Sequence, residues 1–177
     1  IDTLIFQGDK TLTTNPDLKW IDGFVKVFQT DGTEITAPAG ATTLYAKLKA
    51  LYLGMDSKTL NRRAEIYVSS SNYRTLLQDL VDANLYHYPS AESGTFPTEI
   101  FLPGTNIKVV MAEGLDGAET VALATFPDNM RYGCDMENDQ EDIRIKWDDV
   151  KEIFHVKALW NSGVQVAFPG MAYWMTI

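Results

Sequence analysis

Apolar residues recur at helical spacing in three segments of the first half of the chain. The three stripes are Leu18, Ile21, Val25 and Phe28; Leu44, Leu48, Leu51 and Met55; and Tyr73, Leu76, Leu77, Leu80 and Val81. Each follows residues that cap helices well: Asn15-Pro16-Asp17, Thr42 or Thr43, and Ser69 to Ser71. We therefore predict helices that begin near residues 15, 42 and 70, the first ending at Asp31-Gly32, with a short helical turn within residues 56–63.

Short alternating or apolar runs predict strands elsewhere. These runs are Leu4 to Phe6, Ala64 to Val68, Ile100 to Leu102, Ile107 to Met111, Thr120 to Thr125, Arg131 to Met136 and Glu152 to Trp160. Ile143, Ile145 and Trp147 alternate with Arg144 and Lys146, which is typical of a strand with one apolar face. Helices first and strands later, without β-α-β alternation, predict an α+β fold with helices packed on a mostly antiparallel sheet.

Three connecting segments complete the prediction. Phe126 to Met130 reads as a turn or a single helical turn, and residues 85–97 read as a long irregular loop. Asn161-Ser162-Gly163 predicts a reverse turn that leads into Val164, Val166 and Phe168. Ala158 to Ile177 has no charged side chain, but its glycines, proline and polar residues favour short strands over a membrane-spanning helix.

Composition and charge narrow the class of protein. Of the 177 residues, 45% are hydrophobic and 22% charged, as in ordinary globular proteins, and one cysteine excludes an internal disulfide framework. Fifteen basic and 24 acidic residues give a net charge of −9, so we expect no general binding to DNA, RNA or anionic membranes. The chain starts at Ile1 without a signal segment, and we expect a processed product or an excised fragment.

Candidates for nucleophilic catalysis are few. A serine or cysteine hydrolase needs a base, and only His87 and His155 could supply one. No Gly-x-Ser-x-Gly elbow occurs, and Cys134 lies in Tyr-Gly-Cys-Asp, which matches no nucleophile signature. We expect an exposed aromatic loop around His87, a satisfied structural histidine at 155, a half-buried Cys134 and no enzyme activity. A hydrolase using either histidine stays open as an alternative.

Metal and phosphate sites are not indicated. Zinc needs clustered cysteine and histidine, and positions 87, 134 and 155 are too widely spread. The acidic run Asp135 to Asp142 departs from a calcium loop, because Gln140 replaces the required glycine and Lys146 the required glutamate. No glycine-rich phosphate loop occurs. We expect no metal and no cofactor, and a solvated loop or charged sheet edge at the acidic run.

Aromatic residues keep a second class of function open. The four tryptophans are Trp20, Trp147, Trp160 and Trp174. Together with Tyr86-His87-Tyr88 they could line a groove in a carbohydrate- or protein-binding module, although tryptophans lie more often in cores or interfaces. Two of the 24 acids could also meet as a glycosidase pair, but no particular pair is indicated.

Several segments together carry a resemblance to a known family. Ala64 to Leu80 (AEIYVSSSNYRTLLQDL) resembles the strand, small-residue cap and helix in the capsomer-centre domain of tailed-bacteriophage major capsid proteins, a fold shared with encapsulin shells. Asn106 to Met111 (NIKVVM), Thr125 to Tyr132 (TFPDNMRY) and the acidic stretch are similar to its later strands and loop. Val156 to Pro169 (VKALWNSGVQVAFP) resembles the closing hairpin that returns to the shell-forming sheet.

The resemblance extends from Ala41 to Ile177 and implies a phage major-capsid-type fold. Family members carry an N-terminal arm, an extended loop and a long spine helix ahead of this region, and Ile1 to Ala39 would be at most their remnant. We expect one unit over residues 1–177, or a capsomer-centre domain over 1–130 followed by returning strands of a peripheral domain over 131–177. No cross-linking lysine or asparagine can be assigned.

The function implied by the resemblance is structural. We expect the major capsid (head) protein of a tailed phage or prophage, which assembles in the bacterial host cytoplasm into an icosahedral shell enclosing DNA and resides in the virion. Its expected partners are other copies of itself, with a scaffold or maturation protease as further candidates, and neither specific nucleic-acid binding nor membrane association is expected. Residues 85–97 and 135–142 are expected to face neighbouring subunits or solvent.

Overall fold

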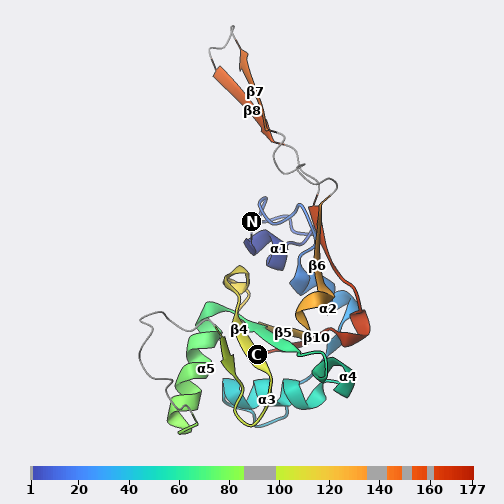
Figure 1. Ribbon diagram of the computed structural model, residues 1–177. Coiled ribbons are helices and arrows are strands. Elements are labelled where there is room, and N and C mark those ends of the chain that lie inside the picture. The colour runs from blue at the N-terminus through green and yellow to red at the C-terminus, as the bar shows by residue number, and fades with distance from the viewer. Residues whose placement is uncertain (1, 86–98, 135–142, 149–152, 159–161) are drawn as a thin grey trace, which may run out of the picture.

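A six-stranded mixed sheet lies at the centre of the fold. The computed structural model describes residues 2–85, 99–134, 143–148, 153–158 and 162–177. The sheet has the order β1-β10-β5-β2-β4-β3. Its strands are β1 (Thr33–Glu34), β2 (Glu65–Val68), β3 (Glu99–Phe101), β4 (Lys108–Met111), β5 (Val121–Thr125) and β10 (Tyr173–Thr176). The predicted α+β class is confirmed (Figure 1).

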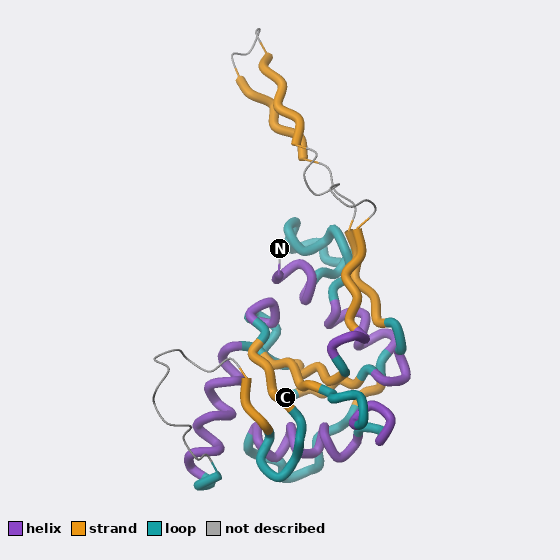
Figure 2. The backbone as a smooth tube through the Cα atoms, viewed as in Figure 1, coloured by secondary structure: helices purple, strands orange, loops and turns teal. Residues whose placement is uncertain are grey.

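Helices cover both faces of this sheet (Figure 2). They are α1 (Asp2–Gln7), α2 (Phe24–Asp31), α3 (Leu44–Gly54), α4 (Ser57–Leu60) and α5 (Ser70–Asp82), with 3-10 turns η1 (Glu113–Leu115), η2 (Pro127–Asn129) and η4 (Pro169–Met171). On one face, Leu48 of α3 and Leu76 of α5 pack with Ile66 of β2. On the other, Phe28 of α2 packs with Leu123 of β5. The sheet is therefore buried on both sides, as its apolar central strands require.

Two predicted helices begin at their predicted caps. Thr43 Oγ1 accepts a hydrogen bond from the Ala46 N–H at 3.2 Å, and Ser69 Oγ accepts one from the Asn72 N–H at 3.3 Å. Each bond satisfies an N–H group that a helix leaves unpaired in its first turn. The stripe predicted on α5 is buried or half-buried apart from Val81, whose side chain is exposed.

The N-terminal segment differs from the prediction in two ways. Residues 4–6, predicted as a strand, lie in α1, because three adjacent apolar residues carry no periodicity of their own. The Phe6 ring packs 5.6 Å from the ring centre of Phe24, and a Cβ atom at Gly114 would collide with it. The helix predicted from residue 15 begins only at Phe24.

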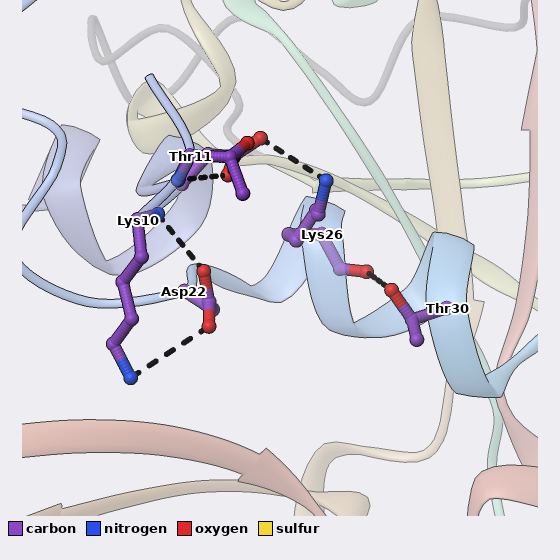
Figure 3. A network of polar contacts seen from close by, with 6 residues as sticks. Lys10, Thr11, Asp22, Lys26 and Thr30 are labelled. Atoms are coloured by element: carbon purple, nitrogen blue, oxygen red, sulfur yellow. Dashed lines mark hydrogen bonds and ion pairs between the residues drawn. The ribbon is translucent and has the colours of Figure 1, made fainter. Parts of the chain in front are cut away.

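Polar contacts explain why residues 8–23 do not form a helix (Figure 3). Asp9 accepts hydrogen bonds from the Thr11 hydroxyl and N–H at 2.6 and 2.8 Å, which lower the pKa of Asp9, and pairs with Lys26 at 3.2 Å. Asp22 accepts a hydrogen bond from the Lys10 N–H at 2.9 Å. Asn15 accepts one from the N–H of residue 17, two positions later, which forms a local turn instead of a helix cap.

The sheet also contains parallel pairs that were not predicted. β2 runs parallel to β4, with α5 and β3 between them in the sequence, and β1 runs parallel to β10. β2, α5 and β4 therefore do form two parallel strands with a helix between them in the sequence. The interpretation that the chain lacks β-α-β alternation was wrong for this segment. Of the seven pairings given by the described strands, the other five are antiparallel, as the prediction of a mostly antiparallel sheet requires.

Four later strands form two ribbons, and in the sequence one ribbon lies between the two strands of the other. They are β6 (Met130–Cys134), β7 (Ile143–Asp148), β8 (Ile153–Ala158) and β9 (Ser162–Val166). β6 pairs with β9, and β7 pairs with β8, both antiparallel. The predicted closing hairpin over Val156 to Pro169 is therefore wrong, because its two strands belong to different ribbons. In Figure 1 the β7–β8 ribbon lies beyond the end of β6, far from the central sheet.

The uncharged C-terminal stretch folds as predicted. Most of its described residues lie in the end of β8, in β9, in η4 and in β10. No helix formed by the described residues has the length and apolar character needed to span a bilayer. The division of the chain at residue 130 stays a prediction.

A polar chain links three neighbouring strands of the sheet. Lys108 Nζ on β4 lies 2.8 Å from Glu99 Oε2 on β3 and 3.9 Å from Glu65 Oε1 on β2. The Tyr67 hydroxyl donates to Glu65 Oε2 at 3.0 Å. Burial and the neighbouring Glu65 carboxylate raise the pKa of the Tyr67 phenol above its ordinary value.

This raised pKa predicts a loss of stability in alkali. Because the folded protein holds the Tyr67 proton more tightly than the unfolded chain, the free energy of unfolding should fall as the pH rises above about 10. Tyr67→Phe should reduce that fall, and Glu65→Gln should reduce it in part. Urea unfolding followed by circular dichroism between about pH 9 and 11 measures the slopes. Equal slopes in wild type and Tyr67→Phe would contradict the prediction.

Candidate interaction surface

The β7–β8 ribbon presents an apolar face to solvent. In its register Trp147 lies opposite Phe154, and Ile145 lies two residues before Trp147 on the same side of the strand. The side chains of Ile145, Trp147 and Phe154 are 67%, 44% and 69% exposed, respectively. We call these three residues the ribbon face.

Trp147 and Phe154 form the centre of the ribbon face. Their ring centres are 4.6 Å apart, and the ring planes are tilted by 55°. A cross-strand aromatic pair of this kind stabilises the register of a two-stranded ribbon. In the described part of the chain no second layer of structure packs on these two rings, and two strands alone are marginally stable in water.

The opposite side of the ribbon is more polar. Lys146 on β7 lies opposite His155 on β8, and both are exposed. Ile153, which pairs with Asp148, is the apolar exception on this side. The ribbon is therefore amphipathic, as the sequence pattern over residues 143–147 predicted. Burial of the ribbon face against a partner would stabilise the complex by about 1.5–3 kcal/mol for each large apolar side chain that the partner covers fully.

A buried asparagine anchors the foot of the neighbouring β6–β9 ribbon. Asn129 has no exposed surface, and its Oδ1 accepts from the Phe168 N–H at 2.6 Å. Its Nδ2 donates to the Phe168 carbonyl at 3.1 Å and to Thr125 Oγ1 at 2.8 Å. The Thr125 hydroxyl in turn donates to the Met171 carbonyl at 2.9 Å. These bonds tie the start of β6 and the end of β9 to the central sheet.

The residues considered for catalysis do not come together. His155 is exposed on β8, in a strand as expected, and Cys134 is the last residue of β6, so the two lie on different ribbons. His87 and residues 135–142 lie outside the described residues. In the described part of the chain, no three residues among histidine, cysteine, aspartate and glutamate are arranged to hold a metal ion.

The tryptophans lie on separate elements. Trp20 in the loop before α2 is 68% exposed, with Lys19 Nζ 5.9 Å from its ring centre. Trp174 on β10 packs half-buried against the core around Phe28. Trp147 lies on the ribbon face, and Trp160 and Tyr86-His87-Tyr88 lie outside the described residues. Trp20, Trp147 and Trp174 therefore contribute to three different environments.

The pairing of β7 with β8 was not predicted from the sequence. The alternating runs at 143–148 and 153–158 are separated by four residues, a spacing typical of a hairpin. The stronger local turn signal at Asn161-Ser162-Gly163 led instead to a pairing of β8 with the strand after it. Phe154 was consequently not assigned to the apolar face that it shares with Trp147.

Comparison with known proteins gives a likeness in structure and none in sequence. No known protein family matches the chain, and no curated protein sequence matches it. Among solved structures, the fold is similar to the virus-like particle from Pyrococcus furiosus, with a TM-score of 0.43 and 9% sequence identity. The similarity covers 84% of this chain and 58% of that chain. The likeness is therefore partial.

Proposed function

We propose that this chain is a structural subunit that associates with copies of itself into a shell. The observation that carries the proposal is the ribbon face, with Ile145, Trp147 and Phe154 exposed on a ribbon that projects away from the sheet. An apolar surface of this kind marks a site of protein association. Closed shells need two complementary surfaces on each copy, and a projecting ribbon supplies one of them.

The finer identity that we propose is the major capsid (head) protein of a tailed phage or prophage. The segments Ala64 to Leu80 and Thr125 to Tyr132, which resemble that family in sequence, support it. In this proposal the shell encloses DNA, forms in the bacterial host cytoplasm and persists in the virion. The subunit needs neither catalytic activity nor a cofactor, and a scaffold or maturation protease would act only during assembly.

A second candidate is a carbohydrate- or protein-binding module. The tilted aromatic pair Trp147 and Phe154 favours it, since exposed aromatic rings are common in binding surfaces. Titration with a panel of glycans, followed by tryptophan fluorescence, separates the two candidates. A saturable shift on titration would favour the module.

Negative-stain electron microscopy over a concentration series tests the shell proposal, with light scattering as a second readout. We expect rings, tubes or shells of regular subunits whose fraction grows with protein concentration. Small monodisperse particles at every concentration, of the mass of one chain by light scattering, would overturn it.

A further inference from the structure

A cleft rich in arginine lies at the foot of the β6–β9 ribbon. Its volume is about 530 Å³, and its lining includes Arg62, Arg63, Arg131, Phe126, Phe168 and Asp128. Arg62 and Arg63 follow α4, Phe126 and Asp128 lie between β5 and β6, Arg131 lies on β6, and Phe168 follows β9. Three cations and one anion therefore meet in a protein whose net charge is −9.

Two phenylalanine rings hold the guanidinium of Arg62 in place. Its Cζ atom lies 5.1 Å from the ring centre of Phe126 and 5.4 Å from that of Phe168. Such cation–π contacts orient the planar group without using its N–H donors. In the part of the chain that the structure describes, neither Arg62, Arg63 nor Arg131 pairs with an acid. Their donors therefore remain open to a ligand.

The backbone conformation of Arg63 also supports a binding role for this cleft. Its φ angle is +58°, in the left-handed region that glycine or asparagine usually occupies at the end of a helix. This backbone conformation does not favour arginine, so it does not explain why an arginine is present. The Arg63 side chain lines the cleft. Strained positions of this kind are often found where a side chain serves a function.

We infer that this cleft binds carboxylate side chains on an acidic segment of a second copy of this chain. The inference deepens the proposed function and names a second contact of the assembly. Arginine matches carboxylates because its planar fork donates two parallel hydrogen bonds. The cleft lies at the foot of the β6–β9 ribbon, away from the β7–β8 ribbon, so it would form a contact separate from the ribbon face. A second copy supplies such carboxylates, because each chain has 24 acids against 15 basic residues, five of the acids within Asp135 to Asp142.

A peptide supplies the first test. The run Asp135 to Asp142 has five acids in eight residues, and a blocked peptide with this sequence serves as the probe. Isothermal titration of the whole chain should show binding that weakens as salt is added. Arg62→Ala combined with Arg131→Ala should weaken binding about tenfold or more, since two charge-assisted contacts are lost. Lys49→Ala, on the exposed side of α3, is the control and should bind as wild type does.

Further variants keep this result interpretable. Arg62→Lys retains the charge but loses the fork, so it should give an intermediate affinity and fold as wild type does. A peptide with all five acids replaced by their amides should not bind. Equal binding of the amide peptide, or wild-type affinity in the double arginine variant, would overturn the inference. Tighter binding of a single-stranded oligonucleotide than of the peptide would overturn it as well.

Sedimentation of the chain without peptide tests the second-copy partner. Self-association should weaken about tenfold in the double arginine variant and should be unchanged in Lys49→Ala. If the arginines govern association but no particles form in electron microscopy, the shell is overturned and the cleft stands. If particles form equally well in the double arginine variant, the cleft is overturned and the shell stands.

Discussion

Replacing Trp147 and Phe154 together by threonine is expected to abolish self-association while leaving the fold intact. In the single chain Trp147 is 44% and Phe154 69% exposed, and both lie on a ribbon outside the two core clusters, so their loss removes the contact between the two rings but leaves the core intact. In an assembly that buries them, each contributes about 1.5–3 kcal/mol. Their combined loss weakens association by roughly two to four powers of ten. Threonine keeps the strand preference of both positions.

Light scattering and electron microscopy measure this effect, and the melting temperature reports on the fold. Lys146→Thr, on the opposite side of the same strand, is the matched control and should assemble as wild type does. Unimpaired assembly of the double variant would show that the ribbon face is not the interface. A fall of the melting temperature by more than a few degrees would show that the two rings stabilise the subunit.

Asn129→Leu is expected to destabilise the subunit by about 3 kcal/mol. The change keeps the size of the side chain but leaves the Phe168 N–H without its acceptor and Thr125 Oγ1 without its donor, while the Phe168 carbonyl keeps the Met171 N–H. Each buried polar group that loses its hydrogen bond costs about 1–3 kcal/mol. In a protein of this size, the melting temperature should fall by about 6–12 °C.

Thermal and urea unfolding followed by circular dichroism measure the loss at Asn129. Asn106→Leu, at an exposed position in the turn between β3 and β4, is the control and should change the melting temperature little. A melting temperature for Asn129→Leu within 2 °C or so of wild type would mean that the foot of the β6–β9 ribbon contributes little to stability.

Much of the local structure could be predicted from the sequence. α3 and α5 begin after Thr43 and Ser69 because a hydroxyl cap and an apolar stripe act within one or two helical turns. The strands at Glu65–Val68 and Val121–Thr125 lie in short apolar runs between turn signals. Prediction failed at residues 8–23, where Asp9 and Asp22 bind backbone and side-chain groups of the same loop.

Half of the candidate interaction surface could also be predicted from the sequence. The alternation over residues 143–147 predicted a strand with one apolar face, whereas its pairing with β8 was missed. The arginine cleft was not indicated at all. Its lining comes from segments around residues 62, 128 and 168, which no spacing in the sequence connects.

Periodicity and capping thus account for where α3, α5 and most strands of this chain form, since both act between close neighbours. They say nothing of which strand pairs with which, because the N–H and C=O groups of a strand can pair with any strand of suitable register. The nesting of β7–β8 inside β6–β9, the parallel pair β2–β4 and the stacking of Arg62 on two phenylalanines depend on long-range packing. Such contacts are stable only once the whole core has formed.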